Sequence, residues 1–193
     1  ESLPLYEPQA LDQRDFYEAV EIVCDGVLTF AERLAQAAEQ QAQTVADENR
    51  RAELQRMAAD LRSAPAEPAR NFRQALNTVW FLHLIQQMES NGHSVSLGRF
   101  DQYLYPYYKR DLQSGAITEE EALELVEHFY LKLFTIIKLR PEKHSRTQSG
   151  YPMYQNLVVG GQLTDGVDAV NPLSWLCLSA LAEVRRSEAR RVG

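Results

Sequence analysis

The stretch that decides the fold is WFLHLIQQMESNGHSVSLGRFDQYL, residues 80–104. Its first part is apolar at most positions and predicts a buried helix, which the Asn91-Gly92 turn ends. Buried helices that end in polar loops often present side chains to a cavity. His93 and Ser94 follow the turn and offer a hydrogen-bond donor and acceptor that suit a hydroxylated small molecule. Taken alone, the residue types favour the alternative that His93 caps the helix end and Ser94 satisfies the turn.

Arg99 and Asp101 stand two positions apart at the start of the next predicted helix, so they do not share a helix face. We expect each of them to hold a different neighbouring loop in place. The functional alternative for Arg99 is an anionic ligand, because guanidinium groups bind carboxylate, phosphate or sulfonate through two hydrogen bonds. The structural role is the favoured one.

A second stretch, QSGYPMYQNLVVGG at residues 148–161, passes from a polar loop into the best strand candidate of the chain, residues 156–161. Aromatic, amide and hydroxyl groups at such a junction are typical of pocket walls, and ordinary loop packing is the alternative. Tyr154, Gln155 and Asn156 would alternate in direction if the strand begins there, so only some of them can face one cavity. The glycine pair that follows fits no phosphate-binding pattern.

Most of the remaining chain has helical periodicity. An apolar stripe from Asp12 to Leu34 predicts a helix whose buried face includes Phe16 and Val23, with close packing around Gly26. Capping, turn and proline signals predict further helices at 47–62, 68–89, from 100 to a stop at Ser114, at 118–139 and from 171 onward. The fold class is therefore mainly α with about one or two short strands. Because a lone strand needs neighbours, we expect the chain to be cut from something larger.

Charge and composition narrow the class of partner. The chain has 193 residues and a formal net charge of −7. Apart from an arginine-rich end that we discount, it has no basic cluster, so binding to nucleic acid or to an anionic membrane is not expected. It has no apolar run of transmembrane length, and its first residues do not form a signal peptide. We expect a cytoplasmic protein.

No catalytic nucleophile or metal site emerges from the residues. Cys24 and Cys177 lie in apolar helical patterns and are expected to be buried thiols in a reducing compartment. His83 is expected to be a satisfied core residue, and His128 is similar. No two histidines have the spacing of metal ligands.

Two long motifs resemble the pyruvate formate-lyase-like glycyl radical enzymes. The first is ESNGHSVSLGRFDQYLYP at residues 89–106, and the second is YPMYQNLVVGGQ at residues 151–162. The segment at residues 164–174, which ends in Asn-Pro-Leu-Ser, agrees with the same family. The order and spacing of the motifs agree from about Arg14 to Arg185.

The resemblance implies a large cytoplasmic enzyme built around a ten-stranded α/β barrel. Residues 1–186 would be an internal part of its domain, and residues 187–193 a tail outside the family. In this family a separate radical S-adenosylmethionine activating enzyme installs a glycyl radical, which generates a thiyl radical on a barrel cysteine. The thiyl radical abstracts hydrogen from a small-molecule substrate, and a C–O, C–N, C–S or C–C bond then breaks. A homodimer is implied for the full-length enzyme.

The family's reactive residues do not match this chain. The cysteine loop of the family reads Gly-Cys-Val-Glu, whereas Cys24 is followed by Asp-Gly and Cys177 by Leu-Ser. The terminal Arg-Val-Gly resembles the radical motif only by chance, so Gly193 is given no role. We therefore expect no catalytic residue, metal or bound cofactor in this chain, and no activity of the chain alone. The organic glycyl radical would belong to the full-length enzyme.

Position by position, the resemblance implies that His93 and Ser94 contact substrate hydroxyls and that Tyr154 lines the pocket. The motif positions that are either pocket or structural are Arg99, Asp101, Gln155 and Asn156. This favours a dehydratase branch acting on a hydroxylated small molecule, with the isethionate, hydroxyproline and arylacetate branches open. The alternatives are the formate acetyltransferase branch of the same family and a non-catalytic helical interaction module.

Overall fold

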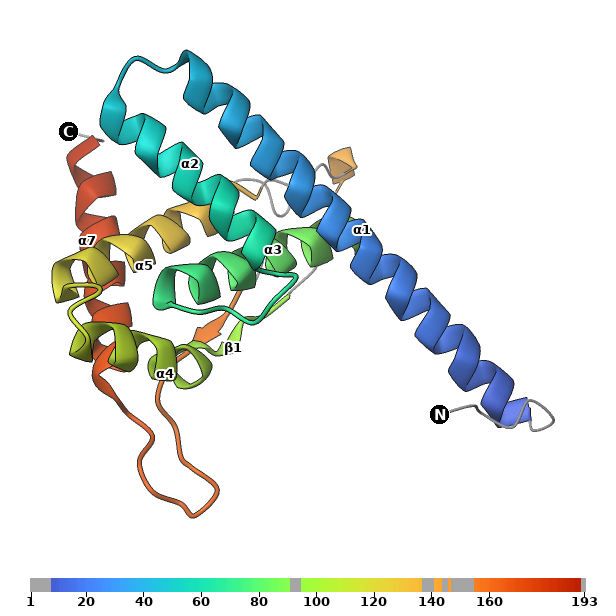
Figure 1. The fold of residues 1–193 in the computed structure, drawn as a ribbon. Coiled ribbons are helices and arrows are strands. Elements are labelled where there is room, and N and C mark those ends of the chain that lie inside the picture. Colours follow the sequence, from blue (N-terminus) through green and yellow to red (C-terminus); the bar gives the residue numbers. More distant parts are fainter. Residues whose placement is uncertain (1–7, 91–94, 137–140, 144–145, 147–154, 192–193) are drawn as a thin grey trace. The chain divides into compact units, whose positions relative to one another are not determined.

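The computed structural model describes residues 8–90, 95–136, 141–143, 146 and 155–191. It divides the chain into two compact units, residues 1–69 and 70–193, which are described separately. Helices make up most of both units, and the described residues include one sheet of two strands (Figure 1). The predicted mainly α composition with one or two short strands is confirmed.

Unit 1 is a hairpin of α1 (Pro8–Thr44) and α2 (Glu48–Ser63) (Figure 1). Asp47 accepts the backbone N–H of Arg50 at 3.0 Å and caps α2 at the predicted boundary. The buried side chains between the helices are almost all small, which lets the two backbones approach closely. This alanine seam consists of Ala35, Ala38, Ala42, Leu54 and Ala58.

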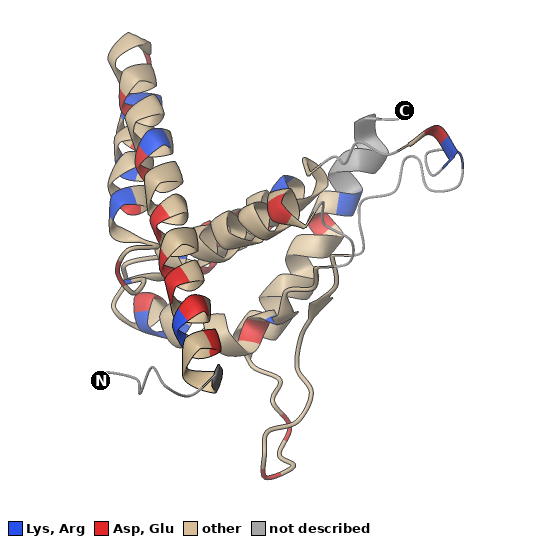
Figure 2. Ribbon diagram, turned by 90° about the vertical axis from the view of Figure 1, so that its right-hand side faces the viewer, with Lys and Arg blue, Asp and Glu red and all other residues tan. Residues whose placement is uncertain are grey.

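One arginine joins the two helices of the hairpin at their surface. Arg62 on α2 donates to Glu32 at 3.0 Å and to Glu39 at 2.9 Å, both on α1. These hydrogen bonds lower the pKa of both carboxyl groups. Because all three side chains are solvated, the pairs align the helices more than they stabilise them. Figure 2 shows other acidic and basic residues spread along the same two helices.

The first half of α1 is exposed, contrary to the predicted buried stripe. Phe16 is 63% exposed and Val23 is 62% exposed. Cys24 is also exposed, and a Cβ at Gly26 would meet nothing within 4 Å, so the expected burial and close packing there are wrong. α1 has 37 residues and α2 has 16. At 1.5 Å per residue, α2 covers about 24 Å of a helix about 56 Å long, so the rest of α1 has no described partner in its unit.

Unit 2 packs four helices around an aromatic core: α3 (Phe72–Glu89), α4 (Phe100–Gln113), α5 (Glu119–Phe134) and α7 (Pro172–Arg191). The ring centroids of Phe100 and Phe129 lie 5.0 Å apart, and those of Phe72 and Tyr108 lie 5.6 Å apart. Asp111 on α4 accepts the N–H of Phe72 at 2.6 Å. A carboxylate therefore lies at the N-terminus of α3, where the helix dipole favours it.

Two predicted helix starts in unit 2 are confirmed by their caps. Thr118 and Glu121 form the capping box of α5, each side chain accepting a backbone N–H of the other residue. The side chain of Asn171 accepts the N–H of Leu173 at 3.0 Å and opens α7.

Two other boundaries differ from the prediction. Asn71 is the N-cap of α3, so this helix starts at Phe72 and not near Pro68. The described part of α5 ends at Phe134, with Thr135 as its C-cap, before the predicted end near Leu139. Side-chain hydrogen bonds to the helix ends decide these positions, and the apolar period does not report them.

The sheet is a parallel pair of two-residue strands, β1 (Gly98–Arg99) and β2 (Leu157–Val158). Gly98 pairs with Leu157 and Arg99 with Val158, and α4 and α5 lie between the strands in sequence. β2 falls inside the predicted strand. β1 is the neighbour that a lone strand requires, and it was missed because two residues carry no readable alternation.

The alanine seam makes unit 1 sensitive to added volume. Ala58 is 0% exposed, so Ala58→Leu should lower the free energy of unfolding of the hairpin by about 1–3 kcal/mol through overpacking. Ala59 is exposed on the same helix, and Ala59→Leu is the matched control, expected to change stability by less than about 0.5 kcal/mol. Urea unfolding followed by circular dichroism measures both. Equal effects of the two variants would contradict tight packing of the alanine seam at Ala58.

Candidate functional site

The two family motifs meet at the sheet. Leu97 donates its N–H to the carbonyl of Asn156 at 2.9 Å, directly before the paired residues of β1 and β2. Because the pairing is parallel, the chains that precede β1 and β2 enter the sheet from the same end. His93, Ser94 and Tyr154 precede these segments in sequence but lie outside the described residues. Their shared pocket stays a prediction.

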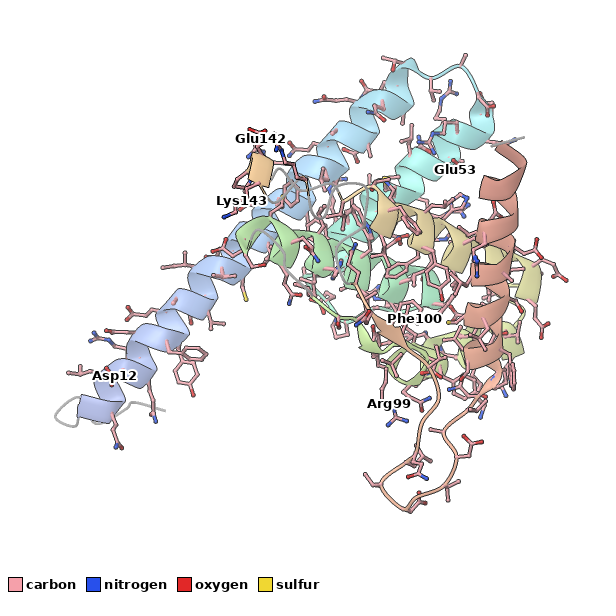
Figure 3. The ribbon with its side chains drawn as sticks, turned by 180° about the vertical axis from the view of Figure 1, so that it is seen from behind. Asp12, Glu53, Arg99, Phe100, Glu142 and Lys143 are labelled. Carbon is pink, nitrogen blue, oxygen red and sulfur yellow. The ribbon has the colours of Figure 1, made fainter. Side chains whose placement is uncertain are left out.

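Arg99 and Asp101 hold one residue, Gly160, from both sides. Asp101 accepts the N–H of Gly160 at 2.7 Å. Arg99 donates to the carbonyl of Gly160 from Nε at 3.2 Å and from Nη2 at 2.9 Å. In Figure 3 the side chain of Arg99 extends from the start of α4 toward the chain that follows β2. The expectation that each side chain ties down a different loop is therefore wrong, because both bind the same backbone unit.

Asp101 also ties α7 to this junction. It is 0% exposed, and the buried hydroxyl of Ser174 donates to the same carboxylate oxygen that binds Gly160. Ser174 in turn accepts the N–H of Asn171 at 2.9 Å. Oδ1 of Asp101 has no hydrogen-bond partner among the described residues. One buried carboxylate thus joins the start of α4, the end of β2 and the start of α7.

The two glycines after β2 adopt backbone conformations that favour glycine. Gly160 and Gly161 have φ of +69° and +91°, a region that L side chains rarely adopt. A Cβ on Gly160 would lie 2.9 Å from Cγ2 of Val170. The carbonyl of Gly161 accepts the N–H of Ala169 at 2.9 Å, which closes the loop between β2 and α7.

Gln155 points into the helices of unit 2. Its Oε1 lies 2.6 Å from Nε2 of His83 on α3, and its Nε2 donates to the carbonyl of Leu133 on α5 at 3.2 Å. His83 is 3% exposed, so the prediction of a satisfied core histidine is confirmed. The sequence does not predict this pairing, because the two residues lie 72 positions apart.

The buried cysteine is not set up as a nucleophile. Cys177 is 1% exposed, as predicted, and burial raises the pKa of its thiol to about 12. The hydroxyl of Tyr130 donates to the backbone carbonyl of the same residue at 3.1 Å. A thiol with this pKa is protonated near neutral pH, and the thiolate is the reactive form.

The described residues hold neither a cluster of metal ligands nor a membrane-spanning helix. They contain no group of three His, Cys, Asp or Glu side chains that could hold a metal ion. None of the helices in this part of the chain is both long and apolar enough to cross a membrane.

The sequence model of the pyruvate formate lyase-like family matches residues 1–190. The chain is 43% identical over 182 residues to the probable dehydratase YbiW of Escherichia coli (strain K12). It is 37% identical over 175 residues to the isethionate sulfite-lyase of Bilophila wadsworthia (strain 3_1_6). These alignments cover 92% and 90% of this chain but 22% and 21% of the relatives, so the chain spans about a fifth of their length.

Two solved structures resemble the chain closely. One concerns 1,2-propanediol dehydration in Roseburia inulinivorans (TM-score 0.88, 41% identity). The other is the glycerol-bound B12-independent glycerol dehydratase from Clostridium butyricum (TM-score 0.86, 40% identity). Each match covers 92% of this chain and 22% of the other. They confirm the predicted fold class, a part of the ten-stranded α/β barrel type.

Removing the Asp101 carboxylate should destabilise unit 2 strongly. Asp101→Ala leaves the N–H of Gly160 and the hydroxyl of Ser174 buried without their acceptor, and each loss costs about 1–3 kcal/mol. Asp165 accepts one N–H in an exposed turn, so Asp165→Ala should cost less than about 1 kcal/mol. The midpoints of urea unfolding compare the two. Similar losses would show that Asp101 does not join the three elements.

Gly160 should tolerate a methyl group less well than Gly166. Both have positive φ, but a Cβ on Gly166 would meet nothing within 4 Å. Gly160→Ala therefore carries the backbone penalty of about 1–2 kcal/mol and the clash with Val170, whereas Gly166→Ala carries the penalty alone. Thermal unfolding of the two variants measures the difference. Adding Val170→Ala to Gly160→Ala should recover part of the lost stability, and no recovery would contradict the clash.

Proposed function

Because the chain belongs to the pyruvate formate lyase-like family of glycyl radical enzymes, we propose that it supplies one wall of the substrate pocket of a glycyl radical dehydratase or lyase. The observation that carries the proposal is the hydrogen bond from Leu97 to Asn156 and the parallel strand pair beyond it. Two segments that lie far apart in sequence run side by side there. Each follows directly after a predicted substrate-binding segment, and both enter from the same end.

His93 and Ser94 would bind the hydroxyl groups of the substrate, and Tyr154 would line the pocket. A hydroxyl-bearing substrate fits a histidine and a serine, which donate and accept hydrogen bonds at short range. Proteins named for 1,2-propanediol, glycerol and isethionate chemistry stand among the relatives. All three are small hydroxylated molecules, which supports a substrate of this class. Cleavage of a C–O bond is the first expectation, with C–S, C–N and C–C cleavage as the other branches.

This part of the enzyme would bind and orient the substrate. The glycyl radical of the full-length enzyme would supply hydrogen abstraction through a cysteine that the proposal does not place here. Neither Cys24 nor Cys177 lies in a Gly-Cys-Val-Glu sequence, which supports this division. We propose residues 1–186 as the part that belongs to the enzyme domain, and Gly193, which lies outside the described residues, receives no role.

The full-length protein would act in the cytoplasm as a homodimer activated by a radical S-adenosylmethionine enzyme. The test expresses the full-length protein that contains this sequence together with that activating enzyme, without oxygen. Electron paramagnetic resonance measures the glycyl radical, and product analysis follows 1,2-propanediol, glycerol, isethionate and trans-4-hydroxy-L-proline. Turnover of at least one of these is expected. A protein that carries the radical and converts none of them would overturn the proposed substrate class.

Single substitutions test the pocket. Ser94→Ala and His93→Ala should each lower kcat/KM about 10- to 100-fold, because each leaves a buried substrate hydroxyl without its partner, which costs about 1–3 kcal/mol. The yield of radical should not change. Ser96 is exposed two residues further on, and Ser96→Ala is the matched control with parent-like kinetics. Parent-like kcat/KM in Ser94→Ala would remove Ser94 from the pocket.

A further inference from the structure

We propose that His83 and Gln155 form a positioning pair that fixes the start of β2 against α3 and α5. The inference rests on the proposed function, because Gln155 directly follows Tyr154, which that function places in the pocket wall. His83 and Gln155 touch no substrate in this proposal. They act by holding the backbone from which the pocket wall extends.

The bond between the two side chains is short and buried. Nε2 of His83 lies 2.6 Å from Oε1 of Gln155, and His83 is 3% exposed. Gln87, one helical turn after His83 and 1% exposed, brings its amide nitrogen within 3.3 Å of the same ring nitrogen. Residues four apart share a helix face, so α3 turns a row of two buried polar side chains toward β2. Buried polar groups of this kind define a structure sharply, because a shifted partner leaves them unsatisfied.

The second hydrogen bond of Gln155 sets the direction of the first. Its amide nitrogen donates to the carbonyl of Leu133 at 3.2 Å, so its oxygen must face His83. An amide oxygen only accepts, and the ring nitrogen it faces must therefore carry a proton. The bond to Gln155 therefore requires the Nε2–H form of His83. In that form the 3.3 Å approach of the Gln87 amide nitrogen brings two donors together and is not a hydrogen bond.

Leu133 is a specific anchor because it lies in the last turn of α5. The final carbonyls of a helix lack partners within the helix. That of Leu133 accepts the N–H of Ile136 at 3.3 Å and the amide of Gln155. Gln155 thereby joins the interior of α3 to the end of α5. The next residue, Asn156, accepts the N–H of Leu97 at 2.9 Å, so the pair also fixes the position of β2 beside β1.

The test uses the full-length enzyme that contains this chain, activated as above. His83→Leu and Gln155→Leu each remove the bond with little change in volume. Each should lower kcat/KM for the converted substrate about 10- to 100-fold, as small displacements of a positioned wall do. The yield of glycyl radical should stay at the parent level. Hydrogen exchange measured by mass spectrometry should become faster in residues 155–160 and stay unchanged in α2.

A conservative variant separates positioning from packing. His83→Gln keeps an amide N–H donor and should restore kcat/KM to within about threefold of the parent and slow the exchange again. His128 on α5 is exposed, with 70% of its side chain accessible, and His128→Leu is the matched control with parent-like results. Equal losses in His83→Gln and His83→Leu would overturn the pair, as would parent-like kinetics and exchange in His83→Leu.

The proposal can also be tested if the leucine variants do not fold or if no tested substrate is converted. If the leucine variants do not fold, Gln155→Glu keeps the size and the acceptor for His83 but sets a carboxylate oxygen against the carbonyl of Leu133. Parent-like kcat/KM and exchange in Gln155→Glu would then overturn the proposal. If the parent enzyme carries the radical but converts no tested substrate, the proposed function fails. The exchange of residues 155–160 still decides whether His83 and Gln155 position β2.

Discussion

The carboxylate of Asp101 is the interaction on which unit 2 depends. It is fully buried, and it accepts hydrogen bonds from the backbone of Gly160 and the hydroxyl of Ser174. Burying a polar group is costly unless hydrogen bonds replace those it made to water. The elements that donate those bonds must therefore converge on one point. This requirement sets the positions of α4, β2 and α7 more narrowly than apolar packing alone does.

Around that carboxylate, residues of the two family motifs form hydrogen bonds with one another. Arg99 holds the carbonyl of the residue whose N–H binds Asp101, and Gln102 donates to the carbonyl of Ala169 at 2.8 Å. The Arg-Phe-Asp-Gln sequence of the first motif thus forms hydrogen bonds with the Val-Val-Gly-Gly sequence of the second motif and with the loop that leads to α7. The residues expected to meet a substrate precede these sequences in each motif.

Local sequence patterns predicted the helices well and the contacts between them poorly. The capping box at Thr118 and the cap at Asn171 are short-range features, and both were predicted from the residues alone. The stripe through Phe16 has the right period, but periodicity cannot tell how far a partner helix reaches. The exposure of that face depends on the length of α2, which lies elsewhere in the sequence.

In the candidate site, too, the contacts between distant residues were not predicted from local sequence patterns. The resemblance predicts that His93, Ser94 and Tyr154 line one pocket, and this stays a prediction. The described residues that follow them in each motif pair as β1 and β2. The shared grip of Arg99 and Asp101 on Gly160 was not predicted, because spacing in one helix says nothing about a residue 59 positions away. The bond between His83 and Gln155 was missed for the same reason. Only the polar character of both residues hinted that they required partners.

The sheet has a consequence for the order in which this part of the protein assembles. Gly98 and Leu157 pair although 59 positions separate them. Closing a loop of that length costs on the order of 4 kcal/mol of chain entropy. A strand pair two residues long returns only a few hydrogen bonds of about 1 kcal/mol each. The pairing alone returns too little free energy to lead the folding of unit 2. We therefore expect it to form after α4, α5 and α7 have packed, so that the backbone next to the predicted pocket takes shape late.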